Sequence, residues 1–116
     1  MKSTMNYKKW DIVLVPFPFT DLTSVKKRPA LIISPDEYNV KLDLVIVSIT
    51  SKLDLEYRIG DYKIQGWKRS NLPKPSMLRM KFATIDKSII VKRLGRLDEQ
   101  DAKGFSKELM NFFQNN

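Results

Sequence analysis

The chain has 116 residues, 42% of them hydrophobic, which suits one domain that can bury a core. It has no cysteine and no histidine, so disulfide bonds, thiolate catalysis, histidine-dependent ribonuclease chemistry and histidine-ligated zinc are excluded. The formal net charge of +8 and the pI of 9.8 favour a polyanionic partner such as nucleic acid.

The positive charge is concentrated in two stretches. Residues 1–28 carry six Lys or Arg against two Asp, and residues 66–96 carry nine against one. Such basic regions are typical of proteins that bind phosphate backbones, although a merely lysine-rich protein is the alternative. No apolar run approaches the ~18 residues of a membrane span, and no secretory segment or basic amphipathic helix is visible. We therefore expect a cytoplasmic protein with no membrane partner.

Apolar runs predict three strands in the first half of the chain, at 11–19, 29–34 and 44–49. The first run is almost continuously apolar, as in a strand that is buried on both faces. Pro16 and Pro18 cannot donate a hydrogen bond to a neighbouring strand, so they mark the end of this strand or an edge. Residues 35–39 predict a turn or a short helical segment.

The second half predicts three further strands and then a helix. The strands are expected at 57–65, 76–82 and 90–97, with a loop at 66–75 and a connection at 83–89. Apolar residues then recur at helical spacing after Asp98, a suitable N-cap, which predicts an amphipathic helix over about 99–113. This order indicates a single α+β domain, mainly β, over residues 1–116. We expect a compact barrel-like sheet with a C-terminal helix.

Five short segments carry a resemblance to a known family. In order they are DIVLVPFPFTD (11–21), KRPALIIS (27–34), SITS (48–51), SMLR (76–79) and TIDK (84–87). Together they resemble the PemK/MazF toxin ribonucleases of bacterial type II toxin–antitoxin pairs. The resemblance implies an SH3-like barrel that usually forms a homodimer. It also implies a sequence-selective, metal-independent endoribonuclease that cleaves single-stranded RNA such as mRNA and needs no cofactor.

Arg28 and Thr50 are the predicted catalytic residues. Pro29 biases Arg28 toward an extended backbone at the entrance of a strand, where its guanidinium could bind two phosphate oxygens, although a solvated turn is the alternative. Thr50 and Ser51 end the third strand, where strand-end capping is the alternative role. The resemblance pairs the two catalytic residues, because family members have a Thr here together with the Arg before the Pro.

These residue types permit RNA cleavage without histidine or metal. The ribose 2′-hydroxyl can attack its own 3′-phosphate, which leaves a 2′,3′-cyclic phosphate and a 5′-hydroxyl. Arg28 would stabilise the phosphorane and is a candidate proton donor to the leaving oxygen. The acidic residues show no spacing typical of a Mg²⁺ site.

Several other residues are expected to support the site. Arg79 matches an arginine that one branch of the family uses in catalysis, but Lys81 stands where that branch has an acid, so both are predicted to hold phosphate. Asp11 or Asp21 could orient Arg28, with solvated acids as the alternative. The remaining predicted RNA contacts are Ser51, Lys26, Lys27, Lys68, Arg69 and Trp67. For Trp67, packing into the core is the alternative.

Two functions remain as alternatives to the nuclease. One is a non-enzymatic toxin of the same fold that poisons DNA gyrase, and the other is a plain nucleic-acid-binding module. The segment 20–27 replaces the family's glycine-rich loop, so the sequence does not predict a cut site. For either toxin, the charge of +8 predicts an acidic antitoxin as the second partner.

Overall fold

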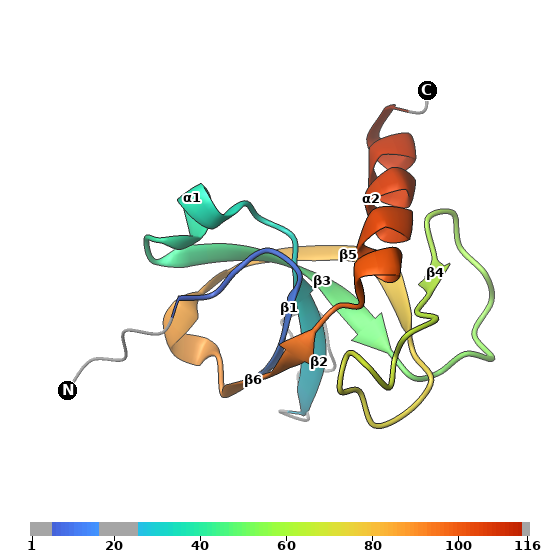
Figure 1. The fold of residues 1–116 in the computed structure, drawn as a ribbon, viewed down its shortest axis with the longest axis horizontal. Coiled ribbons are helices and arrows are strands. Elements are labelled where there is room, and N and C mark those ends of the chain that lie inside the picture. The colour runs from blue at the N-terminus through green and yellow to red at the C-terminus, as the bar shows by residue number, and fades with distance from the viewer. Residues whose placement is uncertain (1–5, 17–25, 115–116) are drawn as a thin grey trace.

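A computed structural model describes residues 6–16 and 26–114 (Figure 1). The elements follow one another as β1 (Asp11–Pro16), β2 (Lys27–Ile32), α1 (Asp36–Asn39), β3 (Asp43–Thr50), β4 (Tyr62–Lys63), β5 (Met77–Asp86), the 3-10 helix η1 (Lys87–Ile89), β6 (Lys92–Arg96) and α2 (Glu99–Gln114). The strands form one sheet in the order β4-β5-β3-β2-β1-β6, and every neighbouring pair is antiparallel.

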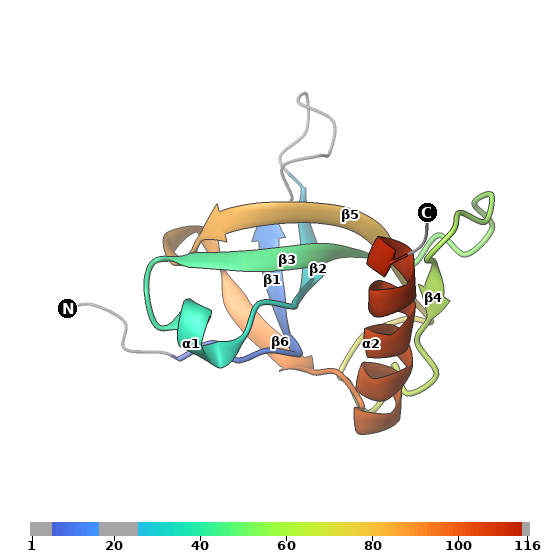
Figure 2. The ribbon, with the colours of Figure 1, turned by 90° about the horizontal axis from the view of Figure 1, so that it is seen from above.

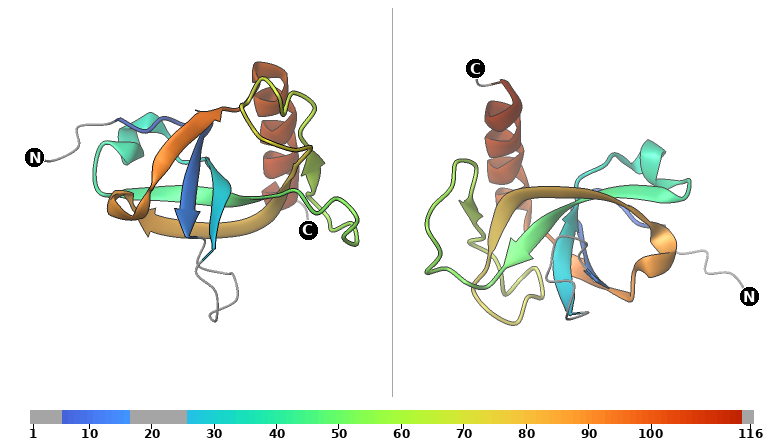
Figure 3. Two further views of the ribbon diagram at one scale, coloured as in Figure 1. Left: turned by 90° about the horizontal axis from the view of Figure 1, so that it is seen from below. Right: turned by 180° about the vertical axis from the view of Figure 1, so that it is seen from behind.

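The sheet curls into a half-barrel with α2 at one end. Strands β3 and β5 form its long side, and β1, β2 and β6 cross them steeply (Figures 2 and 3). The predicted fold class, a mainly β barrel-like sheet with a C-terminal helix, is confirmed. Within the described ranges, no helix is long and apolar enough to span a membrane.

The strands of the half-barrel carry apolar side chains on both faces. One face buries Val13, Val15, Ala30, Ile32, Leu44, Ile46 and Ile85. The other face buries Ile12, Leu31, Val47, Ile49 and Leu78 against Phe105 of α2 and the residues around β4. Burial on both faces explains why the first runs are nearly continuous in apolar residues rather than alternating.

Two predicted strands differ from the observed ones. Only Tyr62–Lys63 of the predicted strand at 57–65 pairs with β5, and residues 51–59 form an exposed irregular segment. Conversely, β5 continues to Asp86, through most of the expected connection at 83–89, because β3 provides backbone partners for 83–86. Residues 17–19 of the first predicted strand lie outside the described residues.

Helix α2 is fixed to the sheet by its first turn. The backbone N–H of Gln100 donates to Asp98 Oδ2 at 3.2 Å, which confirms Asp98 as the N-cap. Asp101 is fully buried and accepts hydrogen bonds from the Tyr62 hydroxyl at 2.9 Å and from the N–H groups of Gln65 and Gly66 at 2.9 and 2.7 Å. This carboxylate therefore fixes the start of the 66–76 segment, which leads to the candidate site.

Burial, followed by the hydrogen bond and the charge of Asp101, raises the pKa of Tyr62 to about 12. The same tyrosine explains the glycine inside α2, because a Cβ at Gly104 would lie 2.6 Å from the Tyr62 hydroxyl. Packing of the helix on β4 thus offsets the lower helix propensity of glycine.

Candidate nucleic-acid site

Arg28 and Thr50 lie opposite each other across neighbouring strands. Strands β2 and β3 pair from Ile32 and Ile46 to Ala30 and Ser48, and this register, continued by two residues, aligns Arg28 with Thr50. The same row continues to Val15 on β1 and to Met77 on β5. Side chains directly opposite each other in an antiparallel pair project from the same face, so the sheet brings the two predicted catalytic residues together.

Both residues line one small pocket. Its walls are Arg28, Pro29, Ile49, Thr50, Ser51, Pro73, Lys74 and Ser76, and its volume is about 200 Å³. A pocket of this volume has room for a phosphate group. The lining includes two cations and three hydroxyl groups but no carboxylate, a composition that suits an anion.

Arg28 carries an unsatisfied donor in this pocket. Its side chain is half-buried, and its Nε is buried with no hydrogen-bond partner among the residues that the structure describes. Buried donors are nearly always paired in folded proteins, and leaving one unpaired costs about 1–3 kcal/mol. The guanidinium is therefore arranged to receive an acceptor from outside the described chain, such as a phosphate oxygen.

Thr50 is oriented by its own chain. The N–H of Lys52 donates to Thr50 Oγ1 at 3.1 Å, which fixes the hydroxyl at the strand exit. Because the hydroxyl accepts this bond, it can still donate its own proton to an oxygen in the pocket. Ser51, the next residue, is exposed at the same pocket.

Lys74 and Ser76 line the pocket, although neither was singled out from the sequence. In the sequence they follow the 66–71 turn and come just before β5. The Ser76 hydroxyl donates to the Lys74 carbonyl at 2.8 Å. The available signal was the tripeptide Pro73-Lys74-Pro75, which holds a cation on a stiff backbone.

Arg79 does not line the pocket. Its Nε donates to Asp61 Oδ1 at 3.0 Å, and its Nη2 donates to Asp61 Oδ2 and to the Glu56 carbonyl, both at 2.7 Å. The Arg79 and Asp61 side chains are only 7% and 4% exposed. In this structure the guanidinium therefore fastens the irregular 51–61 segment to β5 and presents no donor fork to a phosphate.

The position of Asp11 corrects the expectation that it orients Arg28. Asp11 lies four residues before Val15, the β1 residue that faces Arg28, which is about 13 Å along a strand. It is buried and pairs with Arg93 at 3.0 Å and with Arg96 at 3.3 Å, so it orients those two arginines instead. Asp21, the other predicted acid, lies outside the described residues.

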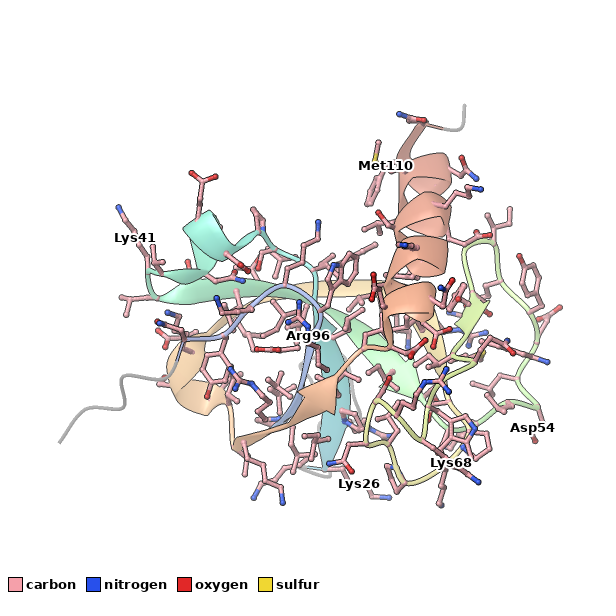
Figure 4. All side chains as sticks on the ribbon, viewed as in Figure 1. Lys26, Lys41, Asp54, Lys68, Arg96 and Met110 are labelled. Carbon is pink, nitrogen blue, oxygen red and sulfur yellow. The ribbon has the colours of Figure 1, made fainter. Side chains whose placement is uncertain are left out.

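The remaining predicted RNA contacts do not line the pocket. Lys26 and Lys27 are exposed just before Arg28, and Lys81 is exposed where β5 shifts register against β3. Lys26 and Lys68 both lie along the lower edge of the molecule in Figure 4, whereas Lys41 lies at its upper left.

The loop at 66–71 combines packing with exposed charge. Trp67 is partly buried against the core, and the Lys68 ammonium lies 5.4 Å from the centroid of its ring. Arg69 is 70% exposed and binds Asp98 at 2.7 Å, a contact that lowers the pKa of Asp98. Trp67 therefore has a structural role here, while Lys68 and Arg69 leave positive charge at the surface.

Comparisons with known proteins identify a family and a shared fold. Residues 8–113 match the family model described as "PemK-like, MazF-like toxin of type II toxin-antitoxin system". No curated protein sequence matches the chain.

Similar solved structures share the fold at low sequence identity. An endoribonuclease in complex with its cognate antitoxin from a Mycobacterial species has a TM-score of 0.74 at 14% identity, over 95% of this chain and 97% of that one. The toxin MazF-mt6 of Mycobacterium tuberculosis has a TM-score of 0.71 at 16% identity, over 91% and 98%. MazF of Deinococcus radiodurans has a TM-score of 0.72 at 17% identity, over 95% and 98%.

Proposed function

Because the chain belongs to the PemK-like, MazF-like toxins of type II toxin–antitoxin systems, we propose that it is a metal-independent endoribonuclease. It cleaves single-stranded RNA, including mRNA, at selected sequences. The products carry a 2′,3′-cyclic phosphate and a 5′-hydroxyl. Arg28 and Thr50 are the catalytic residues.

The observation that carries this proposal is the buried Nε of Arg28, which has no hydrogen-bond partner among the described residues and lies in a small pocket that Thr50 also lines. A phosphate oxygen would satisfy that donor, and the fork of the guanidinium would hold a second oxygen. A toxin that poisons gyrase through protein contacts has no need for such a group.

The chemistry uses what RNA itself provides. The 2′-hydroxyl is the nucleophile, so the protein must hold the phosphate in line and stabilise the charge that develops on it. Arg28 places fixed positive charge at the phosphorane, which is usually the largest catalytic contribution. Thr50 donates a hydrogen bond to a phosphate oxygen or to the ribose.

Incubating the purified protein with single-stranded RNA in excess EDTA tests the proposal. We expect discrete fragments with cyclic phosphate ends, and no fragments from the Arg28→Ala variant prepared in the same way, which controls for contaminating ribonuclease. RNA that is bound but not cut would favour a plain binding module. Intact RNA together with inhibited gyrase would favour the gyrase poison.

The proposed partner of the toxin in the cell is an acidic antitoxin. One solved structure of similar fold is an endoribonuclease in complex with its cognate antitoxin. A disordered acidic tail could cover 26–28 and part of 66–81, where it would compete with RNA. Added salt should slow its association, while apolar contacts should preserve part of the affinity.

A further inference from the structure

The backbone around Lys74 is restrained on both sides. Pro73 and Pro75 flank it, so the preceding residue has a fixed φ and the backbone of Lys74 itself is biased away from the helical region. The Ser76 hydroxyl then holds the Lys74 carbonyl at 2.8 Å, and Leu72 anchors the segment in the core. The residue is exposed, and it is one of the residues that line the pocket of Arg28 and Thr50.

The proposed reaction leaves one proton transfer without a suitable donor. When the bond between phosphorus and the 5′-oxygen breaks, that oxygen must gain a proton. Arg28 is a poor donor because a guanidinium has a pKa above about 12. Hydroxyl groups such as that of Thr50 are weaker acids still. Among the described residues that line the pocket, Lys74 carries the remaining proton-donating cation.

We propose that Lys74 is the general acid of this site and protonates the leaving 5′-oxygen. The assignment rests on the proposed ribonuclease function. In the step, the 2′-oxygen forms a bond to phosphorus and loses its proton to water. The bond from phosphorus to the 5′-oxygen breaks, and the Lys74 ammonium gives its proton to that oxygen. Water then returns a proton to the Lys74 amine, so no proton is gained or lost overall.

A substrate whose leaving atom is sulfur isolates this role. Two RNA oligonucleotides are compared, identical except that one carries sulfur in place of the bridging 5′-oxygen at the cut site. A thiolate leaves without being protonated, so cleavage of the sulfur substrate needs no general acid. Lys74→Met should cut the oxygen substrate at least about 100-fold more slowly than the wild type. It should cut the sulfur substrate at nearly the wild-type rate.

Two variants of the pocket separate proton donation from charge. Lys74→Arg restores the positive charge but not an easily released proton, so it should behave like Lys74→Met. Arg28→Lys should slow cleavage of both substrates, because phosphorane charge must be stabilised in either case. Lys41→Met removes an exposed lysine far from the pocket and should cut both at the wild-type rate.

The assignment is wrong if Lys74→Met is equally slow on both substrates, if it cuts the oxygen substrate normally, or if Lys74→Arg restores full activity. A wild-type protein that cuts neither substrate would instead defeat the ribonuclease function, and the role of Lys74 with it.

Discussion

Arg28 is exposed enough to meet a substrate and buried enough to be held in one geometry. Because its fork would bind two phosphate oxygens, Arg28→Lys should lose activity almost as completely as Arg28→Ala. We expect at least about 100-fold slower RNA cleavage in both variants, in the range found when one transition-state donor is removed. Their melting temperatures should equal that of the wild type or exceed it, since both variants remove or relocate a buried donor that has no partner in the described part of the chain. Near-normal cleavage by Arg28→Lys would contradict the bidentate role.

Asp61 forms a buried ion pair with Arg79. Asp61→Asn leaves the Arg79 charge buried without its counter-ion and should cost about 3–5 kcal/mol in the free energy of unfolding. The double variant Asp61→Leu with Arg79→Met should be more stable than Asp61→Asn, because it removes both charges. Urea unfolding measures the free energy of unfolding of the single and the double variant. If the double variant folds and cuts RNA normally, Arg79 serves the fold alone.

The same ion pair makes the stability of the fold depend on pH. Burial raises the pKa of Asp61, but the hydrogen bonds and charges of Arg79 and Arg58 outweigh burial, so its pKa lies below the ordinary value. A carboxylate with a lowered pKa stabilises the fold above its unfolded pKa of about 3.9, and this stability is lost as pH falls through the folded pKa. The stability difference between the wild type and Asp61→Asn should therefore shrink below about pH 4.

At the scale of elements, Asp101 joins α2 to the segment that leads to the pocket. Asp101→Asn keeps one acceptor oxygen for three donors, so we expect a loss of about 1–3 kcal/mol and faster hydrogen exchange at Gln65 and Gly66. Tyr62→Phe, which removes one donor, should cost less. Equal hydrogen exchange in the wild type and Asp101→Asn would show that the carboxylate does not hold this segment.

Absorbance of the phenolate provides a separate check on this element. Tyr62 should ionise near pH 12 in the wild type and closer to pH 10 in Asp101→Asn, because burial and the nearby carboxylate raise its pKa. Since the folded protein keeps this proton longer than the unfolded chain, stability should decrease between pH 10 and pH 12.

The same elements show what the sequence could and could not predict. Strands buried on both faces and the amphipathic helix leave patterns that depend only on nearby residues, and both were found. The segment at 57–65 alternates like a strand, but only Tyr62–Lys63 pairs with β5, and Arg79 fastens the segment to β5 through the Asp61 side chain instead of through backbone pairing. No local pattern indicates the role of Asp101, because its partners lie 35 to 39 positions earlier in the chain.

Some residues of the candidate site could be predicted from the sequence and others could not. The Arg-Pro pair and the strand-end Thr stand out as motifs, so Arg28 and Thr50 could be predicted. Asp11 was misplaced, because only the register of β1 shows that it lies at the far end of the strand from Arg28. Lys74 and Ser76 were missed, because the Pro73-Lys74-Pro75 tripeptide signals a stiffly held cation but not that it lies beside the end of β3.

At the scale of the whole molecule, a single chain leaves several large apolar side chains in solvent. Tyr57 and Ile59 are 71% and 73% exposed, and both line a small hollow with Phe112 of α2. The next residue on α2, Phe113, is 65% exposed. A second copy could cover this surface and place two basic regions side by side as one RNA track. We expect light scattering at micromolar concentration to give about twice the 13.6 kDa of one chain, and Phe113→Asp to weaken the dimer. A 13.6 kDa monomer that cuts RNA at full rate would rule out a shared track.

We propose above all that the pocket of Arg28 and Thr50 promotes attack of the RNA's own 2′-hydroxyl on the adjacent phosphate. The most direct measurement uses an oligonucleotide with one 2′-deoxyribose immediately 5′ of the cut phosphate, compared with the all-ribose strand in excess EDTA. We predict that the all-ribose strand is cut to a 2′,3′-cyclic phosphate and a 5′-hydroxyl, identified by mass spectrometry, and that the substituted strand stays intact at that position. Cleavage of the substituted strand at the same phosphate, or loss of all cleavage in EDTA, would contradict it.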